Sequence, residues 1–242
     1  MKTTLLALWL TVPLATAAGA ADNAEAFLQE EILAVLRVVE DPDGQTNVRA
    51  GPSTKAKVVA QVPSGSVVSV LPEDAKDGWA RVDDGSEDEH YIHASRLKSL
   101  KSWKQSGPTE VGGNDKSATL KQAGAEIQVK SQPFDAKAHV ITKDADGLVL
   151  VDGGEVWGRD GDLPAHSLEM TVKLGGKEVP LPKEALQHLY EPFMESLVLL
   201  TPGDPARKAV VVMTNGDGAG GYCVAWAFEN GAYRGRAVFV PF

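Results

Sequence analysis

Turn-forming residues recur so often between residues 41 and 100 that we expect short strands separated by turns there. Proline and glycine occur in residues 41–44, 51–53 and 63–65. Proline presets φ and glycine accepts positive φ, so each of these places favours a turn. Short apolar or alternating runs lie around these turns, at residues 58–62, 67–71, 79–82 and 91–93. Several short strands at this spacing predict a small β-barrel.

The same segment carries an ordered set of motifs. Residues 46–53 have the sequence TNVRAGPS, and the turn at residues 63–65 ends in glycine. A Gly-Trp strand follows at residues 78–82, and a closing strand at residues 91–97 starts with Tyr-Ile and ends in leucine. Together these motifs resemble the bacterial SH3-like (SH3b) domain, over about residues 34–99. His90 stands where that family usually has glycine, directly after an acidic insert at residues 83–89, so we expect an altered hairpin there.

The resemblance implies a binding or targeting module in a cell-envelope protein. A barrel of about five strands has a core too small for a catalytic cavity, so its function belongs on the loops. Arg49, Trp79 and Tyr91 are the candidates for a ligand-binding groove. A structural role competes with each assignment: Trp79 is large enough to serve as core, and Arg49 could form an ion pair with the acidic insert.

The first residues predict export. Lys2 precedes an apolar run at residues 5–14, and small residues follow up to Ala20, where we expect signal-peptide cleavage. The run is shorter than the roughly 20 apolar residues that span a membrane. Since no cysteine follows it, we expect no lipid anchor. The mature protein is predicted to be periplasmic or secreted, without membrane insertion.

The net charge limits the classes of binding partner, and the cysteine content limits disulfide formation. The formal net charge is −9, which argues against binding nucleic acid or an anionic lipid surface. A single cysteine, Cys223, cannot form an internal disulfide. The partner that the SH3b resemblance implies, peptidoglycan or an envelope protein, is compatible with this charge.

The rest of the chain divides into a linker and a second domain. Residues 101–119 are polar and rich in glycine, serine and lysine, which predicts a flexible linker. Residues 120–242, which resemble no family we recognise, show strand patterns, one helix pattern at residues 182–190 and a hairpin turn at residues 229–231. The predicted fold is mainly β: an SH3-like barrel at residues 34–100, then an α+β domain with an antiparallel sheet and one helix.

No catalytic or metal-binding set emerges from the sequence. Cys223 lies after the last histidine, His188, whereas wall cysteine peptidases place the cysteine first. It also lies in a predicted strand with Ala225 and Ala227 on the same face, which favours a buried, inert thiol. Of the five histidines only His90 and His93 are close, and a strand points them to opposite faces. We expect no metal and no cofactor, and interpret the acidic turns at residues 144–147 and 160–162 as turn chemistry rather than calcium loops.

The glycine-rich segment at residues 214–222 is the most unusual part of the second domain. It joins two apolar strands, but it has neither the lysine nor the following helix of a phosphate loop. A long hairpin loop is the favoured interpretation. If this domain binds a ligand, Asp217, Trp157 and Trp226 are the candidates.

Two functions remain in view. The first is a non-enzymatic envelope protein whose SH3-like domain binds peptidoglycan or a protein partner. The alternative is an envelope enzyme, such as a cell-wall hydrolase, with its site in the C-terminal domain.

Overall fold

The computed structural model describes residues 30–112, 115–159, 163–216 and 218–240. The predicted signal peptide therefore lies outside the described residues. Among those that are described, no helix is long and apolar enough to cross a membrane.

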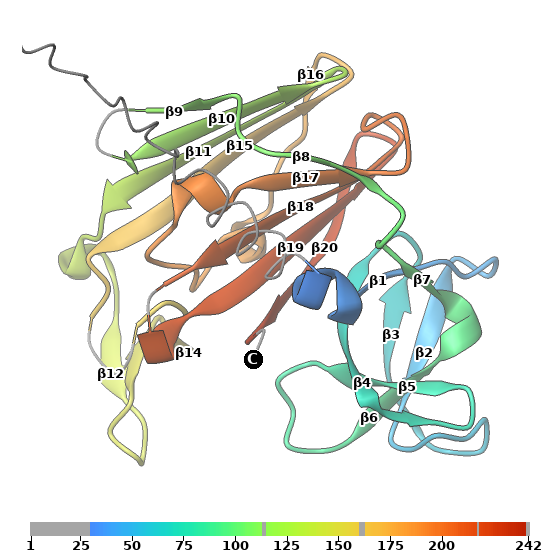
Figure 1. The fold of residues 1–242 in the computed structure, drawn as a ribbon. Helices are drawn as coiled ribbons and strands as arrows, with labels where there is room; N and C mark the ends of the chain where they lie inside the picture. Colours follow the sequence, from blue (N-terminus) through green and yellow to red (C-terminus); the bar gives the residue numbers. More distant parts are fainter. Residues whose placement is uncertain (1–29, 113–114, 160–162, 217, 241–242) are drawn as a thin grey trace, which may run out of the picture.

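The N-terminal part is a barrel-like unit of short antiparallel strands, at the right of Figure 1. A short helix at residues 30–35 leads into it. Alternation along β5 places Ala80 and Val82 inward, where they pack with Val48 and Ile92 in a small core. The strands, in the sheet order β3-β2-β6-β5-β4-β1-β7, are β1 (Leu36–Val39), β2 (Gln45–Arg49), β3 (Val58–Pro63), β4 (Val67–Lys76), β5 (Trp79–Asp83), β6 (His90–His93) and β7 (Leu97–Ser99).

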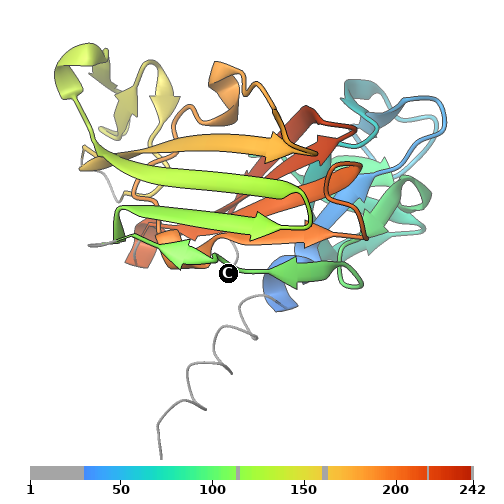
Figure 2. The same ribbon diagram turned by 90° about the horizontal axis from the view of Figure 1, so that it is seen from above.

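The C-terminal part is built mainly from two antiparallel sheets that pack face to face, as Figure 2 shows. A third, small sheet lies at one end. The first sheet contains β16 (Lys177–Glu178), β15 (His166–Leu174), β11 (Ala125–Pro133), β10 (Ser117–Gln122) and β9 (Glu110–Val111). The second contains β20 (Ala232–Phe239), β19 (Tyr222–Glu229), β18 (Lys208–Asn215), β17 (Val198–Thr201) and β8 (Lys104–Ser106). The small sheet contains β12 (Ile141–Lys143), β13 (Val149–Val151) and β14 (Gly154–Glu155).

The second sheet is buried on both faces and forms the central layer of the molecule. Along β19, Tyr222, Val224 and Trp226 face the first sheet in the largest core cluster. The alternate residues Cys223 and Ala225 face the other way and pack against the barrel side. Two-sided burial explains why β18 and β19 are almost continuously apolar instead of alternating.

The barrel and the central sheet share one hydrophobic core. Leu36 and Val67 from the barrel, with Ile32 from the helix, belong to the same buried cluster as Val210 and Phe239 of the central sheet. Polar contacts cross the same boundary. The Ser66 hydroxyl donates to the Arg234 carbonyl (2.8 Å), and the Lys208 ammonium lies 2.8 Å from a Glu40 carboxylate oxygen. The two parts are therefore packed together directly.

Residues 101–119 do not form the predicted unstructured linker. They contain β8, β9 and the first residues of β10, so both large sheets recruit strands from this segment. Gln105 pairs with Leu200, and Val111 pairs with Ala118. Backbone hydrogen bonding of this kind makes little demand on side-chain type, so a polar composition is compatible with these edge strands.

The helix predicted at residues 182–190 is reduced to one 3-10 turn, η4 (Lys183–Ala185). The Ala185 carbonyl accepts hydrogen bonds from the Trp226 indole (2.7 Å) and the Arg236 guanidinium (3.2 Å). His188 then takes a positive φ of 67°, which ends any helical path. Tertiary partners thus replace the intrahelical ones. The other 3-10 turns among the described residues are η1 (Ala94–Arg96), η3 (Ala136–Ala138), η5 (Met194–Ser196) and η6 (Gly218–Gly220).

Candidate functional site

A polar groove of about 330 Å³ lies on the outer surface of the barrel. It contains two of the three barrel residues that the sequence singled out, Arg49 and Trp79. Side chains of both charge signs surround them, together with amides and hydroxyls. The other lining residues are Asp41, Asp43, Gln45, Thr46, Asn47, Thr54, His93, Ser95 and Arg96.

Arg49 is positioned by the backbone of β2 and by the loop that follows. Its strand register shifts at Val48/Arg49, and its guanidinium donates a 2.7 Å hydrogen bond to the Ala56 carbonyl. This contact holds the loop between β2 and β3 against the end of β2. In the described part of the chain Arg49 forms no ion pair with the acidic insert.

Trp79 covers the outer face of the barrel instead of filling its core. Strand alternation points it away from Ala80 and Val82, and it is absent from their core cluster. Trp79 is nevertheless only 7% exposed. The His93 ring meets it edge to face, with centroids 5.1 Å apart. The result is an aromatic floor for the groove.

The groove is electrostatically mixed. Asp41 is held at one side, where its carboxylate lies 3.5 Å from the Arg96 guanidinium and accepts a hydrogen bond from the Asp43 backbone. The Asp43 side chain is exposed. A ligand with separated positive and negative groups matches such a lining better than one with a single charge.

Tyr91, the third predicted groove residue, is fully buried and does not line the groove. Its hydroxyl donates to Glu89 (2.7 Å) and accepts from Lys76 (3.1 Å). The hydrogen bond from Tyr91 and the charge of Lys76 lower the pKa of the Glu89 carboxyl. Arg81 reaches the same carboxylate at 3.8 Å. Glu89 of the acidic insert is therefore paired with Arg81 and Lys76, and Tyr91 anchors that network.

The structure describes two of the three candidate ligand-binding residues of the C-terminal part, and these two lie in different environments. Trp157 lies with Gly220 and Gly221 of the glycine-rich loop around a second hollow, of about 220 Å³. Trp226 is fully buried in the large core. Asp217 lies outside the described residues, as does the acidic turn at residues 160–162.

The glycines near this hollow allow two loops to touch through their backbones. Gly158 has a φ of +107°, and a Cβ there would lie 2.6 Å from the Tyr190 carbonyl oxygen. At Gly216 a Cβ would lie 2.7 Å from the Gly220 carbonyl oxygen, and at Gly220 it would lie 2.9 Å from the Arg159 backbone. The unusual glycine content is thus explained by close packing.

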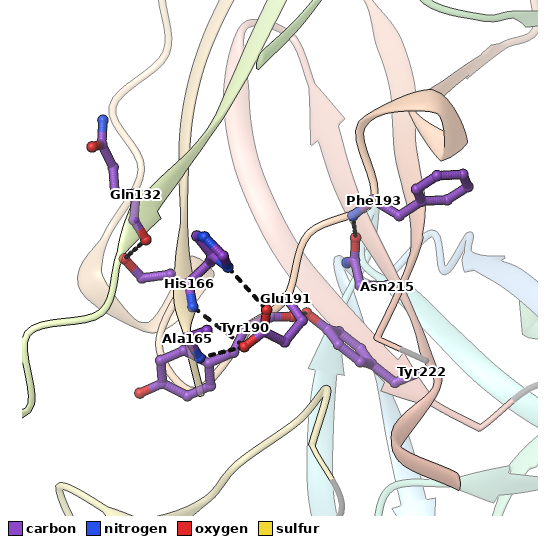
Figure 3. A network of polar contacts seen from close by, with 9 residues as sticks. Gln132, Ala165, His166, Tyr190, Glu191, Phe193, Asn215 and Tyr222 are labelled. Carbon is purple, nitrogen blue, oxygen red and sulfur yellow. Dashed lines mark hydrogen bonds and ion pairs between the residues drawn. The ribbon is translucent and has the colours of Figure 1, made fainter. Parts of the chain in front are cut away.

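A network around Glu191 holds the neighbouring loop in place, as Figure 3 shows. The Glu191 carboxylate accepts hydrogen bonds from the backbone of Ala165 and His166 and lies 3.2 Å from the His166 ring nitrogen. The Glu191 carbonyl accepts from Gly216 (2.9 Å), and the Tyr222 hydroxyl donates to the Tyr190 carbonyl (2.9 Å). These bonds tie the loop at residues 190–191 to the starts of β15 and β19 and to Gly216, which indicates a structural role.

Reactive groups elsewhere are buried or separately paired. Cys223 is fully buried, and burial raises the pKa of its thiol to about 12. His139 is paired with Asp152 at 2.9 Å, and His90 with Asp84 at 2.7 Å. No three metal-ligating side chains converge within the described ranges.

In the turn at residues 144–147, the Asp144 carboxylate is hydrogen-bonded to the backbone of the turn and of the residue that follows it. Asp144 accepts hydrogen bonds from the backbone of Asp146 (2.9 Å) and Leu148 (2.8 Å). The turn interpretation of this acidic segment therefore agrees with the structure.

Comparison with known proteins supports the assignment of the barrel. Residues 44–98 match the family model of the bacterial SH3 domain. This segment holds β2 to β6 and most of the groove, which confirms the resemblance deduced from the motifs. No curated protein and no solved structure matches the chain.

Proposed function

We propose that this protein is a non-enzymatic binding protein of the bacterial cell envelope, and that its barrel groove binds the peptide part of peptidoglycan. The observation that carries the proposal is the groove itself. Most of the groove lies in the segment that matches the bacterial SH3 domain. Acidic and basic side chains surround its aromatic floor. Bacterial SH3 domains are typical binding modules.

The chemistry of the groove suits a short peptide with charges of both signs. Stem peptides of peptidoglycan carry carboxylates and, in many cases, a free amine. Arg49 and Arg96 are the cations that line the groove and can face a carboxylate, and the exposed Asp43 is the anion available to an amine. A volume of about 330 Å³ lies at the lower end of small-ligand sites, so it accommodates a few residues and not a folded partner.

Packing of the barrel against the central sheet leaves the groove open. The shared core uses the helix, β1 and the start of β4. None of the groove-lining residues belongs to that cluster. A polymer such as the cell wall could therefore approach the groove without disturbing the junction of the two parts.

The absence of catalysis is part of the proposal. Cys223 is buried with a raised pKa, which leaves it a poor nucleophile. The groove does bring a histidine and a hydroxyl together, with His93 Nδ1 2.8 Å from Ser95 Oγ. However, the same nitrogen caps the turn η1 through the Ser95 backbone. This contact is therefore interpreted as a local cap.

Sedimentation with purified sacculi tests the proposal. We expect the protein to pellet with sacculi, and retention to weaken with added salt because the contacts are charged. Arg49→Ala or Asp43→Ala should weaken binding on the order of tenfold, the effect of losing a hydrogen bond to a charged group. Lys121→Ala and Glu110→Ala, exposed changes on the first sheet, are the matched controls.

Three outcomes would contradict the proposal. The first is no retention of the natural protein on sacculi. The second is equal retention of the groove variants and the controls. The third is a fall in turbidity of the sacculi during incubation, which would show hydrolysis and favour the enzyme alternative. Mass spectrometry of the protein from a periplasmic fraction tests export, since the mature chain should begin after Ala20.

A further inference from the structure

The hollow beside Trp157 is a preformed apolar cavity that the proposed function does not use. It lies between the small sheet, the glycine-rich loop and the end of β20. Most of its lining is apolar, from segments more than eighty residues apart in the chain. The apolar wall is formed by Leu148, Val149, Val156, Trp157 and Val240.

Backbone contacts hold the wall rigidly. The Trp157 amide donates to the His188 carbonyl, and its carbonyl accepts from the Tyr190 amide, both at 3.1 Å. The indole also packs against the Tyr222 ring, with centroids 5.9 Å apart. The next residue, Gly158, is locked by its close approach to Tyr190. A cavity fixed in this way needs little ordering when a ligand enters.

The rim of the hollow leaves large apolar side chains in solvent. Leu148 is 50% exposed and Val240 is 51% exposed. Isolated exposed apolar residues are ordinary, but here two of them border a concave apolar wall that includes a tryptophan. Such a combination is typical of a surface that a partner covers.

The free charge at the rim is negative. Glu155 forms no ion pair among the described residues and is exposed. The cation of the lining, Arg159, already has an interaction within the protein. A positive group next to an apolar one therefore complements the site. The net charge of −9 favours the approach of such a partner.

The size of the hollow defines the ligand class. About 220 Å³ is below the range of sites that enclose a whole small molecule, but it holds one large side chain. We propose that this hollow binds a single apolar side chain of a protein partner, in a peptide segment where a basic residue beside it pairs with Glu155. This site is separate from the barrel groove, and the proposal does not depend on the function of that groove.

Fluorine NMR of the full chain labelled with 5-fluorotryptophan tests the site. The Trp157 signal is assigned by its loss in Trp157→Phe. Three blocked tripeptides serve as probes: acetyl-Lys-Leu-Lys-amide, acetyl-Glu-Leu-Glu-amide and acetyl-Lys-Ser-Lys-amide. We expect saturable shifts of the Trp157 signal with the first peptide. Binding should be about threefold weaker with the acidic peptide, because an exposed ion pair is lost, and undetectable with the serine peptide.

Variants separate the hollow from general attraction of cations to an acidic protein. Ala219→Phe fills the hollow from an exposed loop position and should abolish the shifts, whereas Val59→Phe, on the barrel edge, should leave them unchanged. Glu155→Gln should remove the preference for the basic peptide over the acidic one. Equal shifts with the leucine and serine peptides, or full binding by Ala219→Phe with unchanged far-UV circular dichroism, would overturn the proposal.

Discussion

Substitution of Leu36 by alanine tests whether the barrel and the central sheet unfold together. Leu36 is fully buried and begins β1 of the barrel. Its cluster contains residues of the helix, the barrel and the central sheet. Shortening this side chain therefore removes contacts from both parts of the molecule.

The expected loss can be estimated from burial. Replacing a fully buried leucine with alanine costs about 3 kcal/mol, from the lost transfer free energy and the cavity that remains. For a chain of this size that corresponds to a midpoint of thermal unfolding about 10 °C lower. Val59→Ala, on the exposed edge strand β3, is the matched control and should change stability by less than about 0.5 kcal/mol.

Urea unfolding of 5-fluorotryptophan-labelled protein provides the assay. Trp79 reports on the barrel, and Trp226 reports on the central sheet. In Leu36→Ala both signals should lose their native position at the same, lower urea concentration. If the Trp79 transition moves while the Trp226 transition keeps its midpoint, the two parts unfold independently and the reasoning from the shared core is refuted.

Gly158→Ala should destabilise the fold by about 3 kcal/mol, because φ is +107° and the new methyl would lie 2.6 Å from a carbonyl oxygen; Gly153→Ala, with positive φ but open space, should cost only about 1 kcal/mol in the same urea assay. The Cys223 thiol should not react with a thiol reagent at pH 8 until the protein is unfolded, and reaction at the rate of a free thiol would contradict its burial. Burial raises the pKa of this thiol from 9.0 to about 12 in the folded protein, so its contribution to stability is complete below pH 9 and should be lost as the pH rises toward 12. The loss of stability over this pH range should be smaller in Cys223→Ala. Burial and the charge of Arg236 lower the pKa of His188, so the free energy of unfolding should fall as the pH drops below 6.5. His188→Asn, which tolerates positive φ, should show a smaller fall in acid titrations followed by circular dichroism, and an unchanged slope would disprove this assignment.

The barrel was predictable from sequence because its determinants are local. Proline and glycine at close spacing dictate turns wherever they occur, and the strands between them have few ways to pair. The segment matched by the family model, residues 44–98, lies within the predicted barrel. The position of Trp79 shows the limit of this approach. Alternation predicts that it faces away from Ala80, but the sequence alone does not say which face is the core.

The second half was less predictable because its determinants are distant in the chain. The helix at residues 182–190 has good local signals, but Trp226 and Arg236 capture the Ala185 carbonyl from more than forty residues away. The continuous apolar runs in β18 and β19 are typical of strands buried on two faces, although from the sequence we predict only strands there. The small face of Cys223 and Ala225 was correctly interpreted as a packing surface, but nothing in the sequence indicates that the barrel covers it.

The positions of the candidate groove residues were predictable only in part for the same reason. Arg49 of β2 and Trp79 of β5 line one groove because both strands pair with β6, which lies between them. Tyr91 does not line the groove, because its hydroxyl is hydrogen-bonded to Glu89, two positions away, and to Lys76 from another strand. An isolated tyrosine in a sequence carries no sign of such partners.

The shared core between the barrel and the central sheet has a consequence for the two proposed binding sites. Two sites joined by a loose tether sample many separations, and the tether length sets the effective concentration of the second site. Here the groove and the Trp157 hollow lie on parts joined by packed side chains, so their separation and orientation are constant. A partner that binds both sites must therefore present its two binding groups at this fixed separation, and a stiff partner of the right length is favoured.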